Sequence, residues 1–193
     1  MLQENALTPI PIHTIGYGNR SIEEFVELLQ QYDMKFLVDI RSQPYSRYNP
    51  DFSKDALEKH LKQAGIRYIF MGDTLGGRPR DDTAYFEDGR VDYEKVAEKD
   101  FYQKGISYLH TAWNKQLRIV LMCSEAKPQA CHRSKLIGKT LQKQNIEVAH
   151  IDETGAIKSQ EQVDLLLTDG QLTLFDDMLG LSRKKYTLPG EEA

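Results

Sequence analysis

The sequence has no apolar run long enough to cross a membrane. Residues 1–8 are polar, and they lack the basic start and the apolar stretch of a secretory signal. Either feature would direct a chain into a membrane or out of the cytosol. We therefore expect a cytoplasmic protein that makes no use of membranes.

Cysteine is scarce, with only Cys123 and Cys131 in 193 residues. Because the cytosol keeps thiols reduced, we expect two free thiols, with a disulfide as the minor alternative. Excess positive charge is also missing, since the formal net charge is −4 at pH 7. This charge argues against coating of nucleic acid by the whole surface, but it leaves nucleic acid as a ligand for a local basic cleft.

What the sequence does contain is a regular alternation of apolar strand-like segments and amphipathic helical segments. The expected strands are Ile10–Ile15, Phe36–Ile40, Arg67–Met71, Leu117–Met122 and Glu147–Ile151, and the expected helices are Ile22–Tyr32, Lys54–Ala64, Tyr93–Trp113 and His132–Gln144. This alternation predicts an α/β fold with a mainly parallel central sheet of about five strands and helices on both faces.

The composition, with 40% hydrophobic residues, suits one compact domain followed by a tail. We expect residues 1–158 to form the α/β domain with an active-site-like cleft. Residues 159–193 are expected to form a short helix, Gln160–Leu167, and a tail in which residues 183–185 are loosely ordered.

The segment from Leu117 to Gln144 is the most informative part of the chain. A buried strand ends in Cys123-Ser124-Glu125, and Cys131-His132-Arg133 opens the helix that follows. Parallel strands present their carboxyl ends at one edge of the sheet, where open α/β folds bind ligands. A thiol, a carboxylate, an imidazole and a guanidinium therefore meet at that edge.

Four of these residues are the candidate catalytic groups, and each has a structural alternative. Cys131 lies at a helix start beside a cation, which favours a thiolate nucleophile, but it can also be a packed turn residue. Cys123 can assist as a nucleophile or fill the core, and Glu125 can act as general acid or base or pair with Arg41. His132 can transfer protons or simply face solvent, and the solvent-facing position is the commoner one.

The loops after the predicted strands are rich in arginine and tyrosine. Asp39 and Arg41 are two residues apart in a strand-like segment, so the carboxylate can orient the guanidinium. Arginine binds phosphate through two parallel N–H groups, and tyrosine rings stack on nucleobases. The expected substrate-binding residues are Tyr17, Asn19, Arg20, Arg41, Ser42, Tyr45, Arg47 and Arg133, with Arg41 and Arg133 holding the anion.

No metal and no cofactor are expected. The spacing of Cys123, Cys131 and His132 matches no common structural zinc pattern, and adjacent cysteine and histidine side chains rarely point to one ion. The Gly16-Tyr17-Gly18 segment lacks the third glycine of the dinucleotide-binding fingerprint. Neither cysteine is followed by arginine at the spacing of the phosphatase and rhodanese loop, because residues 129 and 137 are Gln and Ile.

Three separated motifs resemble the domain of unknown function 488 family. They are residues 14–21, residues 39–46, and Cys123-Ser124-Glu125 with Pro128 and Cys131-His132-Arg133, and the likeness spans about residues 12 to 152. The resemblance implies that Arg41, Cys123, Glu125, Cys131, His132 and Arg133 belong to one site, but it supplies no reaction. Tyr17 and Gly18 depart from the His and Ser expected in the family's first motif.

A second resemblance lies in the tail. Gln171, Leu172, Leu174 and Phe175 are similar to the short peptide with which bacterial replication and repair proteins bind the sliding clamp. The alternative is that these apolar residues pack on the protein's own core.

From these features we expect an enzyme, a hydrolase or a transferase, that acts on a phosphorylated, nucleotide-like or nucleic-acid-derived substrate. The rival hypothesis is a non-catalytic adaptor in DNA replication or repair that binds the sliding clamp through Gln171 to Phe175. A carrier of thiol-bound groups or sulfur is a third possibility.

Overall fold

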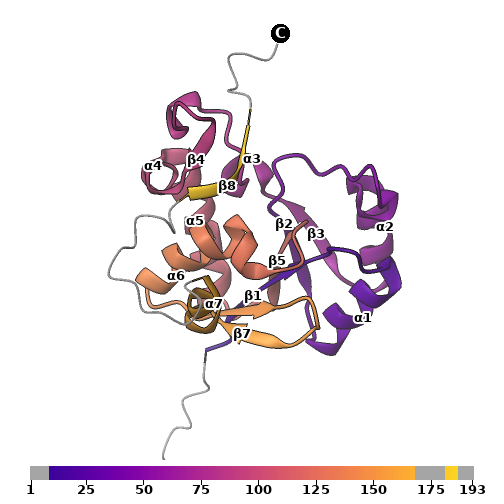
Figure 1. Cartoon of the computed structure of the whole chain (residues 1–193). Coiled ribbons are helices and arrows are strands. Elements are labelled where there is room, and N and C mark those ends of the chain that lie inside the picture. The colour runs from indigo at the N-terminus through magenta and orange to yellow at the C-terminus, as the bar shows by residue number, and fades with distance from the viewer. Residues whose placement is uncertain (1–8, 168–180, 187–193) are drawn as a thin grey trace, which may run out of the picture.

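The computed structural model describes residues 9–167 and 181–186, and a six-stranded sheet forms its centre (Figure 1). The strand order is β3-β2-β5-β1-β6-β7. The first five strands in this order pair in parallel, and β7 pairs antiparallel with β6. The strands are β1 (Ile12–Gly16), β2 (Phe36–Asp39), β3 (Arg67–Phe70), β5 (Ile119–Cys123), β6 (Val148–Ile151) and β7 (Ile157–Ser159).

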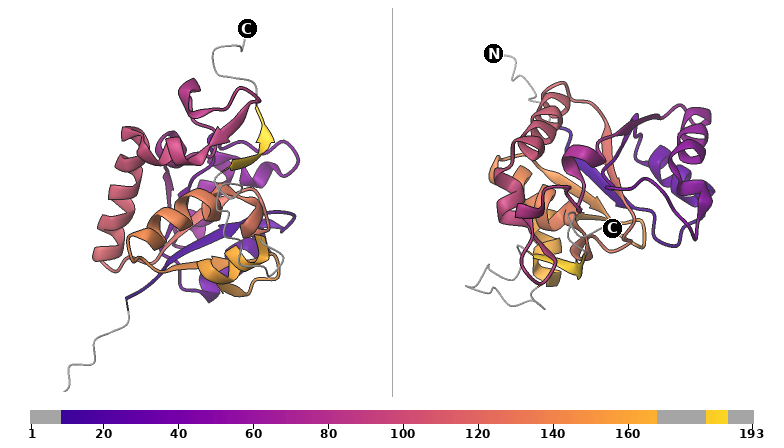
Figure 2. Two further views of the ribbon diagram at one scale, coloured as in Figure 1. Left: turned by 60° about the vertical axis from the view of Figure 1, so that its left-hand side comes forward. Right: turned by 90° about the horizontal axis from the view of Figure 1, so that it is seen from above.

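Helices cover both faces of this sheet. The helices are α1 (Ile22–Gln31), α2 (Lys54–Gln63), α3 (Gly72–Leu75), α4 (Tyr93–Glu98), α5 (Asp100–Asn114), α6 (Lys139–Lys143) and α7 (Gln160–Leu167). One apolar core lies between the sheet and helices α1 and α2. A second core lies on the opposite face of the sheet, beneath helices α3, α4, α5 and α6. Figures 1 and 2 show helices α1 and α2 on one side of the sheet and helices α5 and α6 on the other side. The predicted α/β fold with a mainly parallel sheet is confirmed. The central sheet has six strands where about five were expected, and the strand missing from the prediction is β7.

Local chemistry explains where several helices begin and end. Ser21 and Glu24 form a reciprocal cap, because the Ser21 hydroxyl accepts from Glu24 N at 3.2 Å and Glu24 Oε2 accepts from Ser21 N at 2.9 Å. The helix predicted for residues 93–113 is two helices, since Lys99 has extended backbone angles between α4 and α5. No described helix is long and apolar enough to cross a bilayer.

The end of the described chain is a strand rather than a loose tail. β8 (Leu181–Lys185) pairs antiparallel with β4 (Arg90–Asp92) in a separate two-stranded sheet. The expectation that residues 183–185 are loosely ordered is therefore wrong. The clamp-like peptide, Gln171 to Phe175, lies outside the described residues.

The sheet order places the loops after β1 and β5 next to each other. β5 is the strand between β2 and β1, and its five residues are all buried, as expected for a strand covered on both faces. The chain leaves β1 toward α1 on one face and leaves β5 toward the helical segment before α6 on the other. The two loops start side by side at the sheet edge, and the helical segments that follow them lie on opposite faces. Open α/β sheets bind ligands at such a point.

Candidate active site

The loops after β1 and β5 are held together by their backbones. Tyr17 N donates a hydrogen bond to the Cys123 carbonyl at 3.1 Å, and Gly18 N donates to the Ser124 carbonyl at 3.0 Å. Gly16 is needed at this junction, because a Cβ there would lie 1.7 Å from the carbonyl oxygen of Glu125. The close approach fixes the position of Glu125 relative to the first loop.

Cys123, Cys131 and His132 form a buried cluster at the end of β5, here called the Cys-His cluster. His132 Nδ1 lies 3.7 Å from Cys123 Sγ and 3.6 Å from Cys131 Sγ. All three side chains are buried, and His132 retains 8% of its exposure, so the expectation that His132 faces solvent is wrong. Glu125 adjoins the cluster, since Cys123 Sγ donates to Glu125 Oε2 at 2.9 Å.

The two thiols have opposite electrostatic environments. A hydrogen bond from Cys131, together with the charge of His132, lowers the pKa of Cys123 to about 6 against the effect of burial. Burial and the neighbouring Cys123 raise the pKa of Cys131. In the protein without a ligand, Cys123 is therefore the more acidic thiol, whereas the helix-start argument favoured Cys131.

The imidazole and the carboxylate stabilise each other. Burial alone would lower the pKa of His132, but the charge that Cys123 carries once it has lost its proton, together with the charge of Glu125, outweighs burial and raises the pKa. Burial would raise the pKa of Glu125, but the hydrogen bond from Cys123 and the charge of His132 lower it to about 2. Glu125 is thus ionised at neutral pH.

Two adjoining hollows open above the cluster. One, of about 280 Å³, is the cysteine-side hollow, and the other, of about 240 Å³, is the arginine-side hollow. Cys131 and Tyr93 line the first, and Arg41 and Cys123 line the second. The residues that line both are Gly77, Glu125, His132, Lys184 and Tyr186. The cluster therefore forms a floor shared by the two hollows.

Arg41 lies on the wall of the arginine-side hollow. Its Nε and Nη2 donate to the two carboxylate oxygens of Asp39 at 2.9 and 2.6 Å, which confirms that Asp39 orients it. The guanidinium carbon also lies 5.4 Å from the centre of the Tyr17 ring. Arg41 Nη1 has no hydrogen-bond partner among the described residues. Glu125 does not pair with Arg41, because its Oε1 lies 3.1 Å from Lys184 Nζ.

The family model "Domain of unknown function DUF488" matches residues 21–139, which include Arg41 and the whole Cys-His cluster. The chain belongs to the DUF488 family. This confirms the family that the sequence resembles, and the second and third motifs lie within the matched residues, whereas residues 14–20 of the first motif precede them. The family carries no assigned reaction.

Other comparisons add little to the family assignment. No curated protein matches this DUF488 chain. A crystal structure from Shewanella putrefaciens CN-32, described as a candidate phosphatase (DUF442), is 17% identical with a TM-score of 0.39. That similarity covers 86% of this chain and 80% of the other.

The other predicted binding residues of the DUF488 chain lie in different places. Tyr17, Ser42 and Tyr45 line the arginine-side hollow with Arg41. Asn19 lines a separate hollow of about 550 Å³, which shares Tyr17 with the arginine-side hollow. Arg47 is exposed and lines neither hollow above the cluster.

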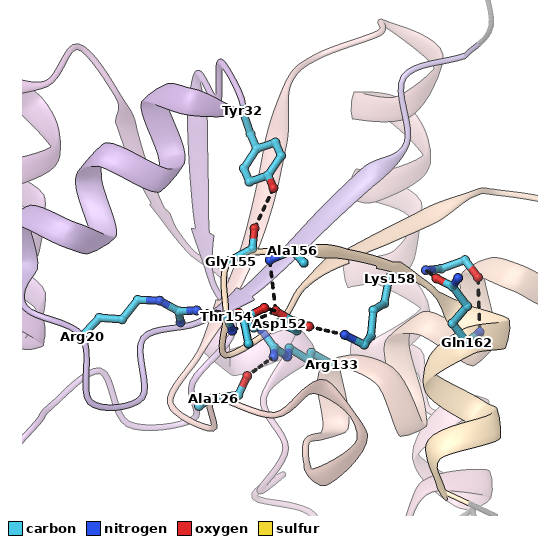
Figure 3. Close-up of polar contacts among 11 residues, drawn as sticks. Arg20, Tyr32, Ala126, Arg133, Asp152, Thr154, Gly155, Ala156, Lys158 and Gln162 are labelled. Carbon is cyan, nitrogen blue, oxygen red and sulfur yellow. Dashed lines mark hydrogen bonds and ion pairs between the residues drawn. The ribbon is translucent and has the colours of Figure 1, made fainter. Parts of the chain in front are cut away.

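Arg20 and Arg133 bind the protein's own backbone, and Figure 3 shows the hydrogen bond from Arg133 to Ala126. Arg20 donates to the carbonyl of Gly16 at 2.5 Å and to that of Asp152 at 2.5 Å. Arg133 has no exposed surface, and its Nη2 donates to the Ala126 carbonyl at 2.8 Å. Arg133 lines neither hollow above the cluster, and its hydrogen bond to Ala126 holds the loop after β5.

Lys184 and Tyr186 were not found from the sequence. Both come from the C-terminal strand region, outside residues 21–139 of the family match, and both line the two hollows. Arg78 lies over the Tyr186 ring, with 5.3 Å from its guanidinium carbon to the ring centre. No local motif marks these residues, because the pairing of β8 with β4 is what brings them to the site.

Proposed function

We propose that this protein is an enzyme that hydrolyses, or transfers a group from, a phosphorylated, nucleotide-like compound bound in the two hollows. The observation that carries this proposal is the position of Cys123, Glu125 and His132 on a floor beneath cationic side chains. Acid, base and nucleophile beside anion-binding groups are the components that both reaction classes require.

Positive charge on the walls supports a negatively charged ligand. Arg41, Arg78 and Lys184 come from three distant parts of the chain and line the arginine-side hollow. Asp39 holds the Arg41 guanidinium in place on this wall, and Lys184 adds an exposed ammonium nitrogen beside it. Phosphate oxygens are the strong acceptors that such nitrogens bind. The anion-holding role expected for Arg133 passes in this proposal to Lys184 and Arg78.

Aromatic side chains beside the cations favour a nucleotide over a simple phosphate ester. Tyr17 and Tyr45 line the same hollow as Arg41, and Tyr45 remains 70% exposed. Tyr48, which is 95% exposed, lines the neighbouring hollow that shares Tyr17. Exposed tyrosine rings offer stacking surfaces for a nucleobase.

Two groups on the floor can attack an electrophilic centre held above it. One is the sulfur of Cys123, and the other is a water molecule activated by Glu125. In either route Glu125 is the acid or base, and a protonated His132 places positive charge beside the sulfur when Cys123 is the attacking group. The sliding-clamp contact of the adaptor hypothesis uses Gln171 to Phe175, which lie outside the described residues.

A turnover screen tests the proposal. The wild-type protein is incubated with nucleoside mono-, di- and triphosphates and short oligonucleotides, and release of phosphate, base or ammonia is measured. We expect turnover of at least one class, lowered at least about 100-fold by Glu125→Gln because the proton-transfer group is lost. Glu161→Gln, on the exposed surface of α7, is the matched control and keeps full turnover. A folded wild-type protein that turns over nothing in this screen contradicts the proposal.

A further inference from the structure

We propose that Cys123, Cys131 and His132 bind one Zn²⁺ ion, and that its fourth coordination position faces the two hollows. Binding of the ion stands on the geometry of the Cys-His cluster alone. Its catalytic use rests on the proposed function, because zinc would supply the attacking water of that reaction.

Both nitrogen-to-sulfur distances within the cluster match those between zinc ligands, and the sulfur-to-sulfur distance needs to reach about 3.8 Å. With Zn–S near 2.3 Å and Zn–N near 2.0–2.1 Å, tetrahedral geometry places a sulfur and a nitrogen ligand about 3.6 Å apart. His132 Nδ1 lies 3.7 Å from one sulfur and 3.6 Å from the other. The three ligand atoms all lie within 4.8 Å of one another. Little movement is therefore needed to surround an ion.

The backbone explains how adjacent residues reach the same point. Cys131 has extended angles, φ −120° and ψ 150°, whereas His132 has helical angles, φ −61° and ψ −21°. The change of conformation between them turns both side chains toward Cys123. The expectation that adjacent cysteine and histidine point apart applies within a continuous helix or strand, and this pair spans the boundary of one.

The donor types and their surroundings suit zinc among the common metals. Two sulfurs and one imidazole nitrogen form a soft ligand set, which magnesium and calcium do not favour. All three side chains are buried. Gly77 packs directly against the imidazole, since a Cβ there would lie 2.6 Å from His132 Nδ1. These contacts hold the ligands in a fixed arrangement.

Three protein ligands leave one position of a tetrahedron open, which is the arrangement of catalytic zinc sites. Cys131, His132 and Glu125 line the cysteine-side hollow, so a water on the ion would face bound substrate. Glu125 follows the ligand Cys123 by two residues, and its carboxylate lies beside the Cys123 sulfur. Zinc-dependent deaminases of nucleobases likewise combine His/Cys/Cys ligands with a glutamate that is not a ligand.

This site selects one of the two routes left open above. With zinc bound, Cys123 is a ligand and the attacking group is the zinc-bound water. That water would give one proton to Glu125 as its oxygen bonds to the electrophilic atom of the substrate, and Glu125 would pass the proton to the leaving group as the bond between that group and the electrophilic atom breaks. The net reaction is hydrolysis, and neither an oxidant nor a reductant is consumed.

Metal content and cobalt spectroscopy test the zinc site directly. Protein produced with added zinc is analysed for metal by mass spectrometry, and metal-free protein is titrated with Co²⁺ while its absorption is recorded. We expect one zinc per chain and cobalt bands typical of tetrahedral coordination with sulfur-to-metal charge transfer. Cys131→Ser and His132→Ala should each weaken binding at least about 100-fold. His110→Ala, which changes a half-buried histidine that is hydrogen-bonded to Gln144 and lines neither hollow, should not weaken metal binding.

Three results would overturn the zinc site or its role. If the wild-type protein binds neither zinc nor cobalt, the cluster is only a thiol–imidazole pair. If Cys131→Ser and His132→Ala bind zinc as tightly as the wild type, the ion lies elsewhere. Turnover that survives complete removal of metal by a chelator overturns the catalytic role and leaves the proposed function standing. Zinc that binds as predicted without any turnover supports the site and contradicts the proposed function.

Discussion

At the residue scale, burial decides the charge of single groups, and His150 shows this most simply. The ring is fully buried between the Thr14 hydroxyl, 2.7 Å from its Nδ1, and Gln160 Oε1, 2.8 Å from its Nε2. Burial lowers the pKa of His150 to about 4, and the hydrogen bond to Gln160 only partly opposes this. The fold therefore requires the neutral imidazole.

This requirement predicts a loss of stability in mild acid. The folded-state pKa lies below the unfolded value of about 6.5, so the unfolded chain binds the proton more readily. Stability is fully present above about pH 6.5 and falls as the pH drops toward 4, by up to about 3 kcal/mol. Urea unfolding between pH 7.5 and 4 measures this loss. His150→Gln should remove most of the change in the free energy of unfolding with pH. If that change is the same in the variant as in the wild type, groups other than His150 cause it.

At the element scale, the most consequential feature is the C-terminal strand β8. It pairs with β4 in a sheet separate from the central one, and it places Lys184 on the wall of both hollows. The side chain of Lys184 is 66% exposed, so its ion pair with Glu125 adds less than about 1 kcal/mol to stability. Lys184 can therefore be changed without unfolding the protein.

Lys184→Ala should raise the KM for the phosphorylated substrate about fivefold and change kcat less. The reason is that an exposed cation near a phosphate contributes on the order of 1 kcal/mol of binding free energy. Steady-state kinetics at low and moderate salt measures the effect, which should shrink as salt rises. Lys185→Ala is the control, since Lys185 pairs with Asp88 instead. Equal effects of the two substitutions would argue that only net charge matters.

Elements with strong local signals could be predicted from the sequence, and those without them could not. The capping pair of Ser21 and Glu24 located α1, and the range expected for the last helix is that of α7. The break at Lys99 has no glycine or proline to mark it. Strands β4, β7 and β8 have three to five residues and depend on partners distant in sequence, so periodicity alone could not reveal them.

At the scale of the whole molecule, the parallel sheet is what assembles the site. Tyr17, Arg41 and Cys123 meet at one edge because β1, β2 and β5 all end there. The sequence predicted this convergence for Arg41, Cys123, Glu125, Cys131 and His132, since each follows a predicted strand or begins the next helix. It did not predict the burial of Arg133 or the contribution of Lys184, because both depend on how remote segments pack.

The central claim is that the hollows above Cys123, Glu125 and His132 bind a phosphorylated, nucleotide-like compound. Calorimetric titration of the Glu125→Gln protein with nucleoside monophosphates and with the corresponding nucleosides tests it most directly, because binding is measured without turnover. We expect one binding site per chain, and we expect each nucleoside monophosphate to bind at least about tenfold more tightly than its nucleoside. Equal affinity for both members, or no binding of either, would contradict it.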